Sequence, residues 1–280
     1  MSVSLKLIAI DMDATLLRDD KSYDEERFNQ VYRKLQEMGV QVVIASGNNV
    51  SKLNEYLDHM DTETIYFAGD NGNYLVKNGE VLQKTAIEPQ DTVETFHTLK
   101  DLGDFDIMMS DGDRNYSDYI REENKEAVHV YYRKIYPVED IQEVAQKGIV
   151  KIACYTRRSL DEAKAATEKI IKKTPGVDAV TSGYNWIDIY HVDGGKGHAV
   201  EAIQEKYGIT AAETMAFGDS LNDASMMAHA AYRVAMGNGD PEFKELANYE
   251  IGTHEEQAVI DVLEEFVETG QLDFMKKYER

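Results

Sequence analysis

Cysteine is nearly absent from this sequence of 280 residues, since Cys154 is the only one. A single cysteine excludes an intrachain disulfide and a zinc site built from cysteines, and we expect Cys154, in an apolar strand, to be buried. Proline is also scarce, with four residues, and no low-complexity tract occurs, so long disordered segments are not expected. With 42% hydrophobic and 9% aromatic residues, the chain can bury a sizeable core.

Long hydrophobic runs are missing as well. No segment reaches the roughly 18 consecutive apolar residues that mark a membrane-spanning helix. Residues 1–4 lead directly into an apolar strand, without the hydrophobic stretch of a signal peptide. We therefore expect a cytoplasmic protein.

Basic residues are few compared with acidic ones, at 30 Lys and Arg against 52 Asp and Glu, which gives a net charge of −22. Such a surface repels nucleic acids and anionic membranes, so we expect neither as a partner. A small anionic substrate is still possible, because a bound cation and a lysine can reverse the field inside a cleft.

Apolar strands alternate with helices at both ends of the chain, over residues 1–83 and 186–280. This alternation predicts a Rossmann-like parallel sheet with right-handed crossovers. The expected strands are Leu5–Ile10, Val40–Ala45, Thr64–Ala68, Trp186–Tyr190, Thr214–Phe217 and Arg233–Met236, and the expected helices include Asp24–Met38, Asn49–Leu57 and Glu255–Thr269.

The middle of the chain, residues 84–185, has shorter strands between helices. We interpret it as a separate α+β insert, so the predicted fold class is α/β with an inserted domain. The elements expected in the insert are the strands Phe105–Ser110, Ile149–Tyr155 and Val177–Ser182 and the helices Glu122–Val128 and Ser159–Lys172.

Two carboxylates, Asp11 and Asp13, directly follow the first apolar strand. Ligands of parallel α/β sheets bind at the carboxyl ends of the strands, so both side chains can share one site. One carboxylate can attack a substrate while the other handles a proton, and both can face a metal ion.

Three further segments place small and polar residues where the same sheet edge is expected. Ser46-Gly47 follows the second strand and precedes a helix, whose N-terminus favours an anion. Lys196 follows Gly194-Gly195, and Asp219 begins a polar segment after the strand Thr214–Phe217. Carboxylates, a hydroxyl, backbone N–H groups and a lysine suit a phosphate ester held against a hard divalent cation such as Mg²⁺.

These segments resemble motifs I to IV of the haloacid dehalogenase-like hydrolases, in the Cof-like branch (subfamily IIB). The motifs D-x-D-x-T-L-L, S-G-N, a lysine after Gly-Gly, and G-D-S-x-N-D occur in the family's order. The resemblance covers essentially the whole chain and implies a Rossmann-like core with a C2-type cap domain at residues 84–185. The Ser-Gly-Asn motif and the stretch Thr181–Asp188 are most similar to the sugar-phosphate phosphatases of that branch.

The resemblance also implies a role for each motif residue. Asp11 would be the nucleophile that forms an aspartyl-phosphate, and Asp13 the general acid and base. Mg²⁺ would be held by Asp11, the backbone carbonyl of Asp13, and Asp219. Asp223 would orient the water shell of the metal or Lys196. The phosphate would be bound by the side chains of Ser46, Lys196 and Asn222 and by the backbone N–H groups of Met12 and Gly47.

Three positions depart from the family's usual pattern. Ala14 stands where glycine is common, and its methyl group could narrow the site if the backbone there needs a positive φ. Asn48 stands where many relatives have arginine, which removes a cation near the rim. Asp70 stands where glutamate is common. None of these changes removes a catalytic group.

We therefore expect a Mg²⁺-dependent phosphomonoesterase that acts on small phosphorylated metabolites, sugar phosphates first. One alternative is a phosphatase of a cofactor phosphate, such as pyridoxal phosphate or flavin mononucleotide. Another is a metabolite-binding or regulatory protein without turnover, against which the intact set of motif residues argues. A monomer and a homodimer are both compatible with the sequence.

In the cap, the segments Ser110–Asn115 and Thr181–Asn185 are expected to face the substrate. The tyrosines Tyr131, Tyr132 and Tyr136 are expected to pack within the cap, with stacking on a ligand as the alternative.

Overall fold

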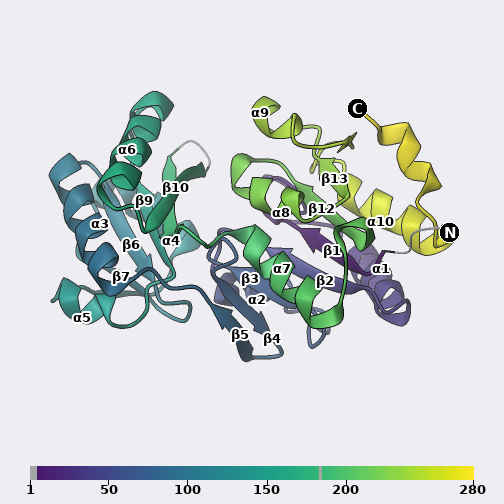
Figure 1. Ribbon diagram of the computed structural model, residues 1–280, viewed down its shortest axis with the longest axis horizontal. Helices are drawn as coiled ribbons and strands as arrows, with labels where there is room; N and C mark the ends of the chain where they lie inside the picture. The colour runs from purple at the N-terminus through teal and green to yellow at the C-terminus, as the bar shows by residue number, and fades with distance from the viewer. Residues whose placement is uncertain (1–4, 183–184) are drawn as a thin grey trace.

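The computed structural model describes residues 5–182 and 185–280, and the chain forms two lobes that are each built on one β-sheet (Figure 1). The larger sheet has the strand order β14-β13-β12-β1-β2-β3-β4-β5. Its strands are parallel from β14 to β3, and β4 and β5 add an antiparallel edge. This confirms the predicted Rossmann-like parallel core. The strands are β1 (Leu7–Ile10), β2 (Gln41–Ala45), β3 (Tyr66–Gly69), β4 (Tyr74–Lys77), β5 (Glu80–Lys84), β12 (Thr214–Gly218), β13 (Tyr232–Ala235) and β14 (Tyr249–Glu250).

Helices cover both faces of this sheet. Successive strand residues point to opposite faces, so Ile8 and Ile10 of β1 pack against α1 (Glu25–Glu37) and α10 (Ala258–Thr269). Leu7 and Ala9 pack on the other face, against α7 (Lys196–Tyr207) and α8 (Ala224–Ala228). Among the described residues no helix has the length and apolar character needed to cross a bilayer. The remaining helices of this lobe are α2 (Val50–Tyr56) and α9 (Pro241–Lys244).

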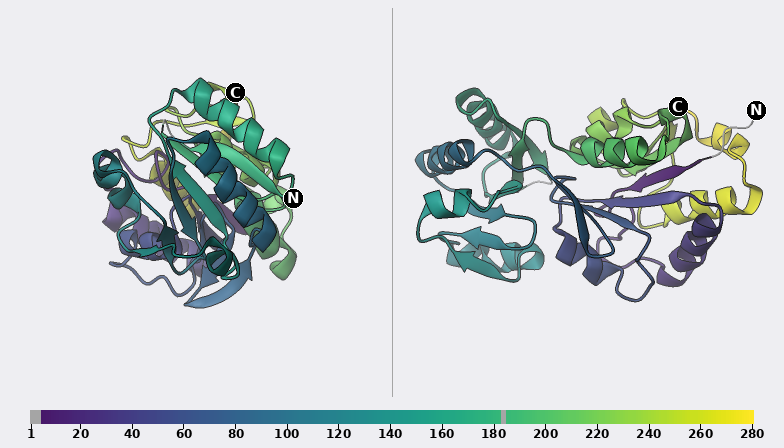
Figure 2. Two further views of the ribbon diagram at one scale, coloured as in Figure 1. Left: turned by 90° about the vertical axis from the view of Figure 1, so that its left-hand side faces the viewer. Right: turned by 60° about the horizontal axis from the view of Figure 1, so that its bottom comes forward.

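The smaller sheet has the order β10-β11-β9-β6-β7-β8. Helices α3, α5 and α6 pack on one face, and α3 and α6 lie in front of the sheet when this lobe faces the viewer (Figure 2, left). Cys154 is buried under this layer, as expected. The opposite face of this sheet, which carries Ala153, Tyr155 and Trp186, packs against α4. The elements are β6 (Asp106–Ser110), β7 (Asn115–Ser117), β8 (Ile135–Pro137), β9 (Lys151–Tyr155), β10 (Val177–Ser182), β11 (Trp186–His191), α3 (Pro89–Leu102), α4 (Lys125–Tyr131), α5 (Ile141–Ala145) and α6 (Leu160–Lys173).

One strand lies in the other sheet from the one that we predicted. The segment from Trp186, expected in the core, forms β11 in the smaller sheet, where it pairs antiparallel with β10 and β9. A hairpin pairs neighbouring segments directly, whereas a parallel core strand needs a long crossover. The boundary predicted after residue 185 thus falls between two paired strands, and we propose that the second lobe extends through His191.

Two helices begin three residues later than predicted, whereas the other predicted helices begin within one residue of the expected start. The segment expected as the helix Glu122–Val128 starts with a 3₁₀ turn at Glu122–Asn124, and α4 follows it. The helix expected at Glu255–Thr269 begins at Ala258, because Gln257 has a left-handed backbone with φ of 60°. Both differences concern helix starts, where local backbone geometry decides and apolar periodicity carries little information.

Candidate active site

The carboxyl ends of three neighbouring parallel strands meet at one edge of the larger sheet. Ile10, the last residue of β1, is in register with Ile44 of β2 and Phe217 of β12. The polar residues that follow these strands therefore lie close together. Asp11 continues the ladder for one more step, since its backbone N–H donates to the carbonyl of Phe217 over 3.1 Å.

Lys196 reaches this edge by a different route from the one that we expected. It is the first residue of α7 and follows the chain that returns from the smaller sheet. Its side chain is fully buried, and Nζ lies 2.5 Å from Asp11 Oδ1 and 2.6 Å from Asp223 Oδ1. Gly72 makes room for this helix start, because a Cβ there would lie 2.6 Å from the Cα of Lys196.

The carboxylates around Lys196 carry more negative charge than one lysine balances. Burial raises the pKa of Asp11 to about 7, although Lys196 opposes the shift. Burial and the neighbouring Asp11 and Asp223 also raise the pKa of Asp219. Carboxylate oxygens of Asp11, Asp219 and Asp223 lie within 4.8 Å of one another. A set of hard oxygen donors with excess negative charge fits a divalent cation.

Asp13 lies at the rim of the same site and is half-buried. Its Oδ1 accepts a hydrogen bond from Lys21 Nζ over 2.6 Å, and its Oδ2 accepts one from Asn48 Nδ2 over 2.7 Å. The next residue, Ala14, has a positive φ of 57°. A positive φ is the condition under which we expected the methyl group of Ala14 to be unfavourable. Ala14 also lines the cavity described below.

The remaining motif residues differ in their burial and in their hydrogen-bond partners. Ser46 is fully buried, and its Oγ accepts a hydrogen bond from the backbone N–H of Asn48 over 3.0 Å. Met12 is also buried, with its side chain in the core beside α1 and α10. Asp223 Oδ2 accepts hydrogen bonds from the backbone N–H groups that open the loop after β12. Asn222 donates to Asn71 over 3.3 Å, next to Gly47.

A cavity of about 590 Å³ lies between the two lobes above these residues. From the larger lobe, Asp11, Asp13 and Asp219 are among the residues that line it. From the smaller lobe, aromatic side chains line it, and the ring of Trp186 lies 5.7 Å from that of Tyr131. The larger lobe therefore gives the cavity an acidic side, and the smaller lobe gives it aromatic rings together with Lys151 and Lys164.

Of the two cap segments that we expected to face the substrate, one contributes to the lining of the cavity and the other does not. Thr181 lines the cavity, but Gly183 and Tyr184 of the same predicted segment lie outside the described residues. The segment Ser110–Asn115 is not part of the lining; Ser110 instead donates to Asp70 across the contact between the lobes over 2.9 Å.

All three tyrosines pack within the cap as expected, and two of them also line the cavity. Tyr132 is buried in the cap as expected, although part of it also lines the cavity. Tyr136 packs against Tyr116 at 6.0 Å between ring centroids. Tyr131 lines the cavity and has a ring that a ligand can reach.

A buried lysine of the cap, Lys151, escaped the sequence analysis. Its Nζ contacts the carbonyl of Gly47 and lies 3.4 Å from Asp70 and 3.9 Å from Asp188. Asn71 also donates to Asp188 over 2.8 Å, so a buried polar network joins the lobes beside the cavity. The sequence feature that could have indicated Lys151 is a lysine at the start of an otherwise apolar strand.

The two lobes with a cavity at the carboxyl edge of a Rossmann-like sheet have the architecture of an α/β enzyme. The chain belongs to the haloacid dehalogenase-like hydrolases, since the model of that family matches residues 8–263. This confirms the resemblance seen in the sequence and the predicted fold class.

Similar proteins of known name are phosphatases. The 5-amino-6-(5-phospho-D-ribitylamino)uracil phosphatase of Escherichia coli is 25% identical over 268 residues, covering 94% of this chain and 96% of the relative. The HMP-PP phosphatase of Cronobacter sakazakii is 27% identical over 278 residues, covering 96% and 98%. These names agree with the predicted class of enzyme, a phosphoric monoester hydrolase.

Solved structures support the fold over nearly the whole chain. A protein of Streptococcus mutans UA159 superposes with a TM-score of 0.87 at 26% identity, covering 95% of this chain and 100% of that one. A sugar phosphatase of haloacid dehalogenase subclass IIB has a TM-score of 0.78 at 20% identity, covering 93% and 98%. The second likeness concerns the fold alone.

Proposed function

We propose that the protein is a Mg²⁺-dependent phosphomonoesterase that hydrolyses small phosphorylated metabolites through an aspartyl-phosphate. The observation that carries the proposal is the convergence of four motif residues at one cavity. Asp11, Asp13 and Asp219 line it, and Lys196 lies directly beneath Asp11. A pure binding protein has no need of a nucleophile and a second carboxylate in this arrangement.

Mg²⁺ would be held by Asp11, the backbone carbonyl of Asp13, and Asp219, with Asp223 in support. The raised pKa values of Asp11 and Asp219 show that burial makes their negative charges costly there, which fits a site for a cation. When bound, the ion would neutralise charge on the phosphoryl oxygens.

In the proposed mechanism an oxygen of Asp11 attacks phosphorus, and the bond to the leaving oxygen breaks. Asp13 donates a proton to that oxygen, so the product leaves as an alcohol. A water molecule then attacks the phosphorus of the aspartyl-phosphate while Asp13 takes up its proton, and Asp11 is regenerated. Lys196 holds Asp11 in place, and with Ser46 and the other predicted phosphate-binding groups it stabilises the oxygens of the transferring group.

A sugar phosphate is the first candidate substrate, and a cofactor-related phosphate is the second. The aromatic wall of the cavity favours the second candidate, because Tyr131 and Trp186 offer rings on which a planar heterocycle can stack. Two relatives named above also carry names of this kind, since their substrates are a phosphorylated ribitylaminouracil and HMP-PP. The cap would close over either substrate and exclude water.

The proposal is tested by phosphate release from a panel of esters, with Mg²⁺ and with a chelator. The panel contains sugar phosphates, pyridoxal phosphate, flavin mononucleotide and p-nitrophenyl phosphate. We expect Mg²⁺-dependent release, lost on chelation, and the order of kcat/KM separates sugar from heteroaromatic substrates. Release that continues undiminished without a divalent cation would contradict the metal role, and release from none of the esters would count against the phosphatase.

The Asp13→Asn variant is expected to slow turnover by about 10²–10⁴-fold, because an amide cannot give or take the proton. Substrate binding should change little, since Asp13 lies at the rim and the proposed phosphate-binding groups stay in place. Single-turnover rates and a titration with a phosphate mimic measure the two effects separately. A collapse of affinity with little change in rate would reassign Asp13 to a structural role.

A further inference from the structure

Both oxygens of the Asp13 carboxylate already have hydrogen-bond donors. Lys21 Nζ donates to Oδ1 over 2.6 Å, and Asn48 Nδ2 donates to Oδ2 over 2.7 Å. A carboxylate whose two oxygens both accept hydrogen bonds cannot rotate freely about its Cβ–Cγ bond. Lys21 and Asn48 therefore fix the plane of the Asp13 carboxylate. Of these two donors, only Lys21 is charged. The side chains of Lys21 and Asp13, which form the ion pair, are 33% and 35% exposed.

The backbone of Lys21 has a conformation that a lysine seldom adopts. Its φ is 67°, in the left-handed region, where a side chain costs free energy that glycine avoids. The turn is closed by two hydrogen bonds, from Lys21 N to the carbonyl of Arg18 and from Arg18 N to the carbonyl of Ser22, both over 2.9 Å. A strained residue persists only where its surroundings hold it.

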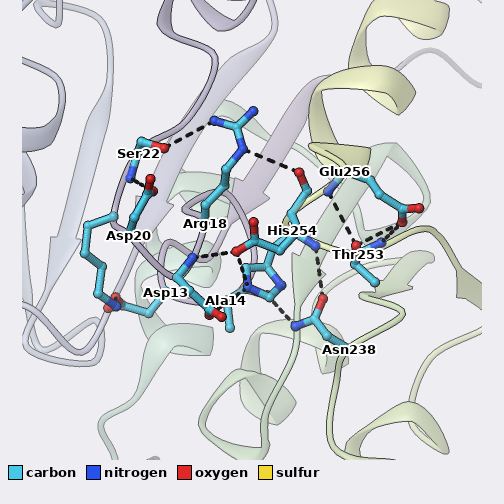
Figure 3. Close-up of polar contacts among 12 residues, drawn as sticks. Asp13, Ala14, Arg18, Asp20, Ser22, Asn238, Thr253, His254 and Glu256 are labelled. Carbon is cyan, nitrogen blue, oxygen red and sulfur yellow. Dashed lines mark hydrogen bonds and ion pairs between the residues drawn. The ribbon is translucent and has the colours of Figure 1, made fainter.

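The surroundings that hold this turn come from the segment before α10, far away in the sequence. Figure 3 shows Arg18 between Ser22 on one side and the segment that contains His254 on the other. His254 Nε2 lies 3.0 Å from Asp19 Oδ1, and Glu255 Oε1 accepts a hydrogen bond from the backbone N–H of Asp19 over 2.8 Å. The turn is therefore anchored through Asp19 by residues that do not themselves line the cavity, and Lys21 reaches Asp13 from this held turn.

Lys21 also faces the cap. Its Nζ lies 5.9 Å from the centroid of the Tyr131 ring, which lines the cavity. The ammonium group thus occupies the place where the rim of the larger lobe meets the aromatic wall of the smaller one. A leaving group in the cavity would lie near both Asp13 and this charge.

We infer that Lys21 is a positioning residue for Asp13, which orients its carboxyl group and stabilises the anion that remains after it has donated its proton. The inference rests on the proposed phosphatase function. In the first step the proton moves from Asp13 to the leaving oxygen as the ester bond breaks, and the new carboxylate charge is balanced by the ammonium group. Lys21 itself neither gives nor takes a proton.

A positioning role of Lys21 predicts unequal effects on two kinds of ester, whereas a purely structural role predicts equal effects. An alkoxide needs a proton as it leaves, whereas p-nitrophenolate is stable as an anion and needs little help from an acid. Removing Lys21 should therefore slow the release of an alkyl alcohol much more than the release of p-nitrophenol. A lysine that only supports the fold, or only binds phosphate, would affect both esters alike.

The test compares Lys21→Met with Lys21→Arg, Asp13→Asn and the wild type. Lys6→Met is the matched control, because Lys6 forms an ion pair of the same 2.6 Å length with Glu213, just before β1 and away from the cavity. Single-turnover release is measured in Mg²⁺ for the best alkyl phosphate of the panel and for p-nitrophenyl phosphate. Melting temperatures monitor folding.

We expect Lys21→Met to slow alkyl release by about tenfold or more, within the loss caused by Asp13→Asn. Its rate with p-nitrophenyl phosphate and its KM should change less than about threefold. Lys21→Arg should retain most of the alkyl rate, and Lys6→Met all of it. Equal loss on both esters, a change in KM alone, or no difference from Lys6→Met would overturn the inference. A wild type without Mg²⁺-dependent release would contradict the phosphatase proposal instead, so the two failures are distinguishable.

Discussion

The Asp11→Asn variant is expected to lose phosphate release from every ester, by at least about 10⁴-fold, because an amide is a poor nucleophile. Asn has nearly the same shape as Asp, so the pocket should remain intact. Lys196 can keep a hydrogen bond to the amide oxygen in place of the present 2.5 Å contact. Turnover comparable to that of the wild type would exclude Asp11 as the nucleophile.

The same variant should be more stable than the wild type at high pH, which separates lost chemistry from lost folding. Burial raises the pKa of Asp11 to about 7 from an ordinary value of 3.8. Above pH 7 the folded wild type must keep this carboxylate ionised at a cost that the unfolded chain does not have. Asn removes that cost, and the gain should shrink as the pH falls from 7 towards 4, where the folded wild type takes up a proton.

Melting temperatures of both proteins in a chelator, at pH 8 and pH 5, measure this difference. We expect the variant to melt higher at pH 8 and the gap to narrow at pH 5. A variant that melts lower than the wild type at pH 8 would show that the charge of Asp11, through Lys196, supports the fold more than its burial costs.

Much of the edge that carries the candidate site could be predicted because topology dictates it. A parallel sheet brings the carboxyl ends of its strands to one edge, so Asp11 and Asp219, which each follow an apolar strand, were expected at the same edge. The assignment of roles needed more than this geometry, and it came from the order of the motifs.

The sequence did not reveal which sheet the strand from Trp186 joins. Buried strands of both lobes have apolar residues, and pairing with β10 and β9 depends on contacts that periodicity does not encode. The glycines before Lys196 suggested a strand end of the core. They belong instead to the connection that leads from the smaller sheet into α7.

The two lysines missed in the sequence have partners that no local pattern indicates. Lys151 contacts the carbonyl of Gly47, 104 residues away in the chain. Lys21 lies only eight residues from Asp13, but its direction depends on a turn anchored by His254. In both cases the charge is placed by tertiary contacts between distant segments, and such contacts appear only when the fold is assembled.

Replacing Lys196 by Met is expected to have the largest effect on stability. The side chain is fully buried between Asp11 and Asp223, so its loss leaves buried carboxylates without a cation. Removing one partner of a buried ion pair typically costs about 3–5 kcal/mol of the free energy of unfolding. The loss should be largest at pH 8 and smaller at pH 5, because burial raises the pKa of Asp11 to about 7 and its protonation at pH 5 then relieves part of the repulsion. Phosphate release should also be lost.

A second substitution distinguishes this electrostatic explanation from simple loss of packing. Adding Asp223→Asn to Lys196→Met removes one of the unbalanced charges, so the double variant should recover part of the stability but none of the activity. Lys6→Met, which breaks a partly exposed ion pair with Glu213, should cost less than about 1 kcal/mol. Chemical denaturation of all three variants at pH 8 measures these differences. If the double variant were no more stable than Lys196→Met, the methylene chain of Lys196, rather than its charge, would be what the core of the site requires.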